Sequence, residues 1–151
     1  AGGNQNTASG KSACVSGGIS NTASGAYASV SGGSGNAASG IRSSVSGGGS
    51  GIASGTNASV SGGRENISSG SNASVSGCYK NTAQGSSSSV SGGQQNVSGA
   101  YYASVSGGMR YARSPITSVA TPPTPNERKP CRTRRIGSPP SPRRSCSSRW
   151  R

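Results

Sequence analysis

Serine hydroxyl groups are the side-chain chemistry that this sequence repeats at a fixed spacing. A Ser-Val-Ser triplet recurs every 15 residues from Ser29-Val30-Ser31 to Ser104-Val105-Ser106. Along a strand, two such hydroxyls would lie about 6.7 Å apart, and successive ranks would follow about every 4.8 Å. A regular array of this kind could order water or bind a crystal surface such as ice. The candidate surface array is Ser29, Ser31, Ser44, Ser46, Ser59, Ser61, Ser74, Ser76, Ser89, Ser91, Ser104 and Ser106.

The residues required for catalysis are scarce. The sequence has no His and no Asp, and its acidic residues are Glu65 and Glu127. Paired-carboxylate catalysis, Ser-His-Asp triads and His-based metal sites therefore lack their parts. None of the cysteine spacings resembles a zinc site; the cysteines are Cys14, Cys78, Cys131 and Cys146. We predict that the protein is not an enzyme and has no catalytic, cofactor-binding or metal site.

A strict repeat must position the serine array. Valines recur at intervals of 15 residues without a slip, at Val15, Val30, Val45, Val60, Val75, Val90 and Val105. The unit around each Val reads N-x-A-S-G-x-x-A-S-V-S-G-G-x-x. Only 28% of the residues are hydrophobic, which is too few for an ordinary layered core. Gly and Ser resist helix interiors, and 15 residues suit one turn of a β-solenoid. We predict an all-β solenoid (β-roll) of about seven turns.

Alternation within the unit assigns each side chain to a face, because successive strand residues point in opposite directions. We expect Asn21, Ala23, Ala28 and Val30 to point inward, with Thr22, Ser24, Ser29 and Ser31 outward. The reverse assignment would bury serines and expose every Val. The repeating Asn would form an interior ladder, since side-chain amides can hydrogen-bond from turn to turn. The turns would stack into a flattened rod about 33 Å long.

The corners of each turn should hold the glycines and the variable residues. Gly25-type positions and the doubled glycines are expected there, where a positive φ is often required. Long side chains fit at corners because corners face water. Tyrosines at such positions are candidate adhesive contacts, since exposed Tyr binds at low entropic cost. They are Tyr27, Tyr79, Tyr101 and Tyr102.

Composition divides the chain near Gly108. Residues 1–108 contain four basic side chains and one acidic one, whereas residues 109–151 contain eleven basic side chains, one acidic one and all eight prolines. We therefore expect a 15-residue-repeat solenoid over 1–108 and a disordered Pro/Arg/Ser-rich basic tail over 109–151. The tail could bind nucleic acid or an anionic surface. An out-of-frame reading of the repeat gene is an alternative explanation of its composition.

Two further motifs bear on modification and cross-linking. N-x-S triplets begin at Asn57, Asn66, Asn72 and Asn96. An inward-pointing Asn66 or Asn96 could not accept a glycan, for steric reasons. A disulfide between Cys14 and Cys78 is excluded if the two residues lie about 20 Å apart along the rod.

The S-V-S-G-G and N-x-A-S-G halves of the unit resemble the left-handed β-roll repeats of YadA-like head domains in trimeric autotransporter adhesins. The resemblance covers residues 1–108 and implies a homotrimer on a bacterial surface. The alternating halves of seven and eight residues are also similar to the x-x-N-x-V-x-G repeats of grass ice-recrystallisation inhibitors.

These observations predict a non-catalytic, extracellular, structural or adhesin-like repeat rod of a bacterial surface protein. An ice-binding protein that uses the outward Ser-x-Ser array is the alternative, and a nucleic-acid binder acting through the tail is a third. No apolar run reaches the roughly 18 residues that span a bilayer, so we expect no transmembrane segment. The chain starts at Ala1 in the middle of a repeat, so we also expect it to be a fragment without its signal peptide.

Overall fold

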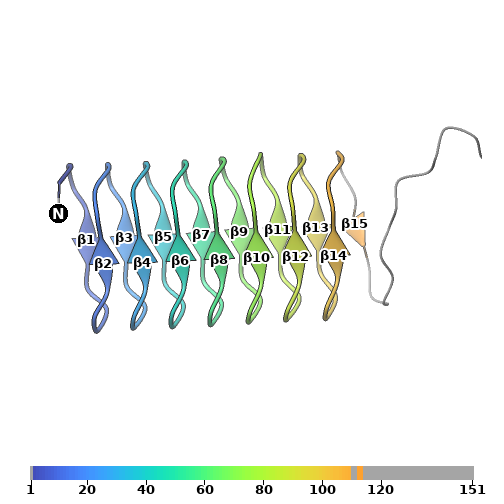
Figure 1. Ribbon diagram of the computed structural model, residues 1–151, viewed down its shortest axis with the longest axis horizontal. Coiled ribbons are helices and arrows are strands. Elements are labelled where there is room, and N and C mark those ends of the chain that lie inside the picture. The colour runs from blue at the N-terminus through green and yellow to red at the C-terminus, as the bar shows by residue number, and fades with distance from the viewer. Residues whose placement is uncertain (1, 110–111, 114–151) are drawn as a thin grey trace, which may run out of the picture. The chain divides into compact units, whose positions relative to one another are not determined.

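A computed structural model describes residues 2–109 and 112–113. Over these residues the chain forms strands, bridges and bends and no helix, and it winds into a stack of parallel coils (Figure 1). The predicted all-β solenoid of about seven 15-residue turns is confirmed. In the part of the chain that is described, no helix is long and apolar enough to cross a bilayer.

Each turn contributes one short strand to each of two parallel sheets. The eight-stranded sheet contains β1 (Thr7–Ala8), β3 (Thr22–Ala23), β5 (Ala37–Ala38), β7 (Ile52–Ala53), β9 (Ile67–Ser68), β11 (Thr82–Ala83), β13 (Val97–Ser98) and β15 (Ala112–Arg113). The seven-stranded sheet contains β2 (Cys14–Val15), β4 (Ser29–Val30), β6 (Ser44–Val45), β8 (Ser59–Val60), β10 (Ser74–Val75), β12 (Ser89–Val90) and β14 (Ser104–Val105).

The register between neighbouring turns is 15 residues throughout. In the seven-stranded sheet, Ser29 pairs with Ser44 and Val30 with Val45, and the same offset relates Thr22 to Ala37 in the other sheet. Isolated bridges such as Ile19 to Ser34 keep the offset outside the strands. The ladder continues beyond Gly108, because Met109 bridges Gln94 and β15 pairs with β13.

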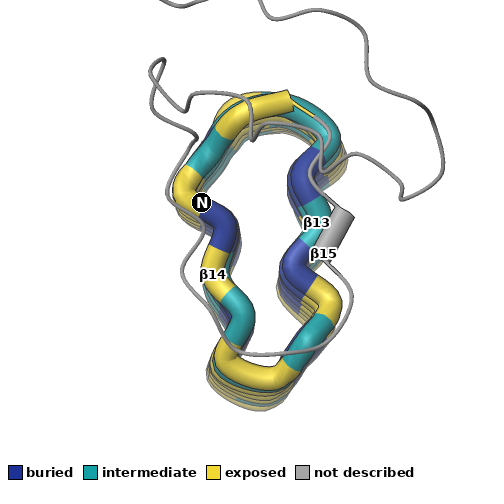
Figure 2. The backbone as a smooth tube through the Cα atoms, turned by 90° about the vertical axis from the view of Figure 1, so that its right-hand side faces the viewer, coloured by how far each residue is buried: buried dark blue, intermediate teal, exposed yellow. Residues whose placement is uncertain are grey.

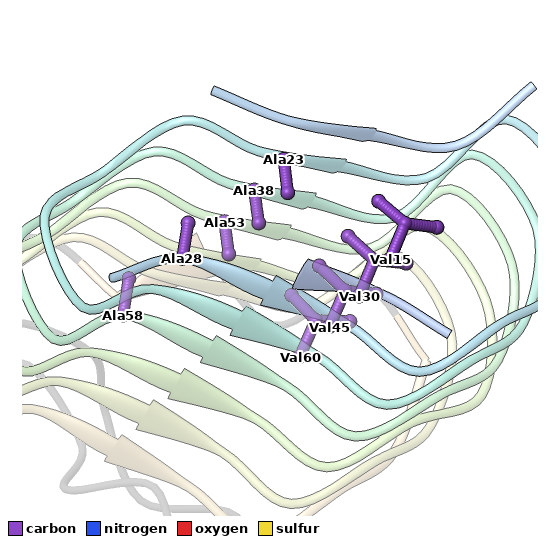
Figure 3. Packing of buried hydrophobic residues seen from close by; sticks show 9 residues of the cluster. All are labelled: Val15, Ala23, Ala28, Val30, Ala38, Val45, Ala53, Ala58 and Val60. Atoms are coloured by element: carbon purple, nitrogen blue, oxygen red, sulfur yellow. The ribbon is translucent and has the colours of Figure 1, made fainter. Parts of the chain in front are cut away.

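The interior holds narrow columns of small side chains. Viewed along the stack, the chain outlines a flattened loop whose buried positions lie on its two long sides (Figure 2). Val30, Val45, Val60 and Val75 are at most 1% exposed and form one column. Alanines from both sheets face the same interior (Figure 3). The inward and outward assignment derived from alternation is therefore correct.

The Asn column is also buried, but its hydrogen bonds differ from the amide-to-amide ladder that we expected. The Asn21 Nδ2 donates to the carbonyl of Gly17 in its own turn (3.0 Å) and to that of Gly33 in the next turn (2.9 Å). Its Oδ1 accepts the backbone N–H of Asn36 (3.0 Å). Each interior Asn therefore binds backbone groups at a corner, in addition to backbone bonds such as the one from Ile19 N–H to the Gly33 carbonyl (2.9 Å).

Two narrow edges join the long sides, and their glycines differ in backbone conformation. The glycine-pair edge consists of residues 17–20 and their repeats. There Gly18 has a φ of 90°, and a Cβ on it would also overlap the carbonyl of Gly33 in the next turn. The single-glycine edge consists of residues 25–27 and their repeats. The expectation of a positive φ at Gly25-type positions was wrong: a Cβ on Gly25 would overlap the carbonyl of Gly40 in the next turn, so close backbone contact requires glycine there. The left-handed conformation falls instead on residues such as Ser20 (φ 54°) and Tyr27 (φ 60°).

Candidate functional site

The structure places the predicted serine array on the outer face of the seven-stranded sheet. The serines that begin the triplets, such as Ser29 and Ser59, are half-buried except for the exposed Ser104, whereas those that end them, such as Ser31 and Ser61, are exposed. Cys14 and Ser16 continue the two columns toward the N-terminus. Within a column the hydroxyls come close enough to interact, since Ser89 Oγ and Ser104 Oγ lie 3.2 Å apart. We call this surface the serine face.

The serine face carries no charged side chain within residues 2–109. In that range the charged residues lie on the two edges: Lys11 and Arg42 on the single-glycine edge, and Arg64, Glu65 and Lys80 on the glycine-pair edge. Both broad faces are therefore neutral, and water or a flat surface can approach them without desolvating an ion.

The outer face of the eight-stranded sheet has a different character. The outward residues of its strands form one column, in which Ile52 is 38% exposed and the others are half-buried: Thr22, Ala37, Ile52, Ile67 and Thr82. This column is more apolar than any column of the serine face.

The four candidate tyrosines do not form a cluster. Tyr27, Tyr101 and Tyr102 lie on the single-glycine edge, whereas Tyr79 lies on the opposite, glycine-pair edge. Tyr101 and Tyr102 are 74% and 77% exposed, and Tyr27 lies five turns away, or about 24 Å along the stack. Arg42 covers the ring of Tyr27, with its guanidinium carbon 5.8 Å from the ring centre. The Tyr101–Tyr102 pair is thus the most open aromatic surface of the described residues.

A small charged cluster surrounds Tyr79. Glu65 forms ion pairs with Arg64 (3.3 Å) and with Lys80 in the next turn (3.2 Å). The Lys80 ammonium also lies 5.2 Å from the centre of the Tyr79 ring. A hydrogen bond with Tyr79, followed by the hydrogen bond and charge of Glu65, raises the pKa of Lys80. These contacts hold the Lys80 and Tyr79 side chains against the edge. They contribute little to stability, because the cluster faces water.

Some interior positions were missed by sequence reasoning, which assigned the serines to the outside. Ser43, Ser68, Ser88 and Ser98 are buried where the repeat otherwise has Ala. Ser43 donates to the Gly40 carbonyl and Ser98 to that of Ala103, each across 2.8 Å. The hydroxyls of Ser68 and Ser88 have no partner. These four serines could have been identified from the sequence, because each occupies a position of the repeat unit that is Ala in most other turns.

The remaining candidates offer no further chemistry in the described residues. Cys14 and Cys78 are both free thiols at the surface. No group of three His, Cys, Asp or Glu side chains that could hold a metal lies within 2–109 and 112–113. The predicted disordered tail and its nucleic-acid site fall outside the described residues, apart from Met109, Ala112 and Arg113, and so do Cys131 and Cys146.

Neither a protein-family model nor a curated protein sequence matches this chain.

Proposed function

We propose that the chain is a non-catalytic, extracellular repeat rod of structural or adhesin-like type, which displays edge residues on a stiff support. The observation that carries the proposal is that the faces and the edges of the solenoid carry different kinds of side chain. Hydrogen-bonded backbone and uncharged, non-aromatic side chains build the two faces, while the aromatic and charged side chains of residues 2–109 occur on the edges. A scaffold of this kind can vary its edges without disturbing its core.

The Tyr101–Tyr102 pair is the part of the edge best suited to contact a partner. Both residues are more than 70% exposed, and the preceding turn has only the small Ser86 and Ser87 at the equivalent positions. Rigid aromatic side chains contribute a large contact area at a low entropic cost. Adhesion would therefore depend on these rings more than on the half-buried Tyr79.

The test is binding of the full chain to a panel of surfaces, namely extracellular-matrix proteins, mucin and polysaccharide films, measured by surface plasmon resonance. Tyr101→Ser with Tyr102→Ser should weaken binding at least about tenfold, which corresponds to about 1.4 kcal/mol. The matched control is Tyr79→Ser, which should leave binding unchanged. Absence of binding to every surface, or equal loss in the control, would contradict the adhesive role.

Ice binding is a second candidate, favoured by the neutral, regular serine face. It predicts that the full chain inhibits ice recrystallisation and produces thermal hysteresis. Ser59→Tyr, which places a bulky ring on that face, should abolish both activities. Thr56→Tyr is the matched control. It adds a ring at an exposed edge position, and the equivalent position three turns later already has a tyrosine, Tyr101. If both variants keep or both lose the activity, the serine face is not the ice-binding surface.

A further inference from the structure

The four N-x-S triplets fall into two structural classes. Asn66 and Asn96 belong to the buried Asn column, and each is 0% exposed. The Asn66 Nδ2 donates to Gly62 (2.7 Å) and Cys78 (3.1 Å), and its Oδ1 accepts from Asn81. The Asn96 Nδ2 donates to Gly92 (2.8 Å) and Gly108 (2.9 Å). A substituent on either nitrogen would fill the interior and break the corner.

Asn57 and Asn72 have the opposite environment. Both are exposed on the single-glycine edge, one turn apart, in the left-handed conformation (φ 55° and 56°). Their backbone N–H groups are already bonded to the carbonyls of Ile41 and Thr56 in the preceding turn, each across 2.8 Å. The side chains interact with each other, because Asn57 Nδ2 donates to Asn72 Oδ1 (3.0 Å). An amide nitrogen has two protons, so Asn57 can lose one and keep this bond.

We propose that Asn57 and Asn72 are acceptor sites for N-linked glycans, and that the fold excludes glycans at Asn66 and Asn96. The amide nitrogen attacks the anomeric carbon of a lipid-pyrophosphate-linked oligosaccharide. The bond from that carbon to the pyrophosphate oxygen breaks, one amide proton leaves, and the lipid pyrophosphate is released. The attached glycan would cover the middle of one narrow edge and leave both broad faces open. The inference rests on the extracellular part of the proposed function, since the donor is met on export.

The test uses the full chain with a cleavable export signal, secreted from a eukaryotic host. Enzymatic deglycosylation in ¹⁸O-water converts each glycan-bearing Asn to labelled Asp, which peptide mass spectrometry locates. We expect labelled residues 57 and 72 and unlabelled residues 66 and 96. Label at residue 66 or 96 in secreted protein, or no label at 57 and 72, would overturn the proposal. Because the host supplies export, these outcomes are independent of whether the rod adheres to a surface.

Replacing the serine that ends each N-x-S triplet by alanine gives matched variants that keep all four asparagines. Ser59→Ala with Ser74→Ala should abolish the glycan. Ser68→Ala with Ser98→Ala, which disables the two buried triplets, should leave the glycan pattern unchanged. A glycan that persists in the first pair, or is lost in the second, would contradict the assignment. Circular dichroism of each secreted variant verifies that it has folded.

Discussion

The backbone N–H of Asn36 donates to the side-chain oxygen of Asn21 across 3.0 Å, so one turn of the solenoid is tied to the next at a corner. The same contact recurs between Asn66 and Asn81 and between Asn81 and Asn96. The column is interrupted at Gly51, whose N–H bonds to the Oδ1 of Asn36 (2.8 Å) but which has no side chain to bond to the next turn.

Gly51→Asn should therefore stabilise the protein. The new amide would donate to the carbonyls of Gly47 and Gly63 and accept from the backbone of Asn66, as its equivalents do in other turns. Each net hydrogen bond contributes about 0.5–1.5 kcal/mol, so the three bonds should give a gain of about 1.5–4.5 kcal/mol. The measurement is thermal and urea unfolding followed by circular dichroism.

Gly51→Ala is the control for this change. It adds the same Cβ, which lies 3.1 Å from Asn36 Oδ1 and 3.4 Å from a methyl of Val45 and of Val60, without the amide. The Asn variant must unfold at a higher temperature than the Ala variant. Equal stability of the two would show that the amide hydrogen bonds contribute nothing at this corner.

Gly40→Ala and Gly47→Ala should differ greatly in their effect on stability, although both glycines lie at corners, one on each narrow edge. A Cβ on Gly40 would overlap the Gly55 carbonyl, whereas one on Gly47 has no atom within 4 Å. We expect a loss of about 2–3 kcal/mol or more at Gly40 and a change within about 0.5 kcal/mol at Gly47. Urea midpoints of the two variants provide the comparison, and similar values would mean that the turns are less closely stacked at Gly40.

Ser88→Ala should raise stability by about 1 kcal/mol or more, because it removes a buried hydroxyl that has no partner. Ser43→Ala, at the equivalent position three turns earlier, removes a hydroxyl that donates to Gly40 and should cost about 0.5–1.5 kcal/mol. The opposite signs are the prediction, measured by thermal melts under identical conditions. Two changes of the same sign would refute it.

Cys78→Gly should stabilise the glycine-pair edge. Cys78 has a φ of 65° where the turns on either side have Gly63 (φ 80°) and Gly93 (φ 81°). Relief of the left-handed strain, offset by the greater freedom of unfolded Gly, leaves a gain of about 0.5–1 kcal/mol. Cys78→Ser keeps the Cβ and should differ from the parent by less than this. Melting temperatures under reducing conditions would decide, and a stabilising Ser variant would point to the thiol instead of the backbone.

The inward and outward assignment could be predicted from the sequence because it depends on a period of two. Val30 and Ser29 differ in polarity and alternate in every unit, so burying one set exposes the other. The period of 15 then fixed the stacking of Val30 on Val45. These are properties of pattern alone, and they needed no knowledge of the corners.

Corner geometry could not be predicted in the same way. Gly25 and Gly18 are both glycines beside variable residues, and at both a Cβ would overlap a carbonyl of the next turn, yet only Gly18 has a positive φ. Similarly, Ser43 and Ser88 occupy equivalent positions, and only the three-dimensional arrangement separates the bonded hydroxyl from the unbonded one.

The constant offset of 15 residues has a genetic consequence. Removing residues 46–60 would join Val45 to Ser61, which restores the same Val-Ser junction. The stack would lose one turn, and the remaining turns would pair with the same offset of 15 residues. Unequal recombination between units can therefore shorten or extend the molecule in steps of about 4.8 Å without any compensating substitution. The length of the solenoid is therefore inherited as the number of 15-residue units in the gene.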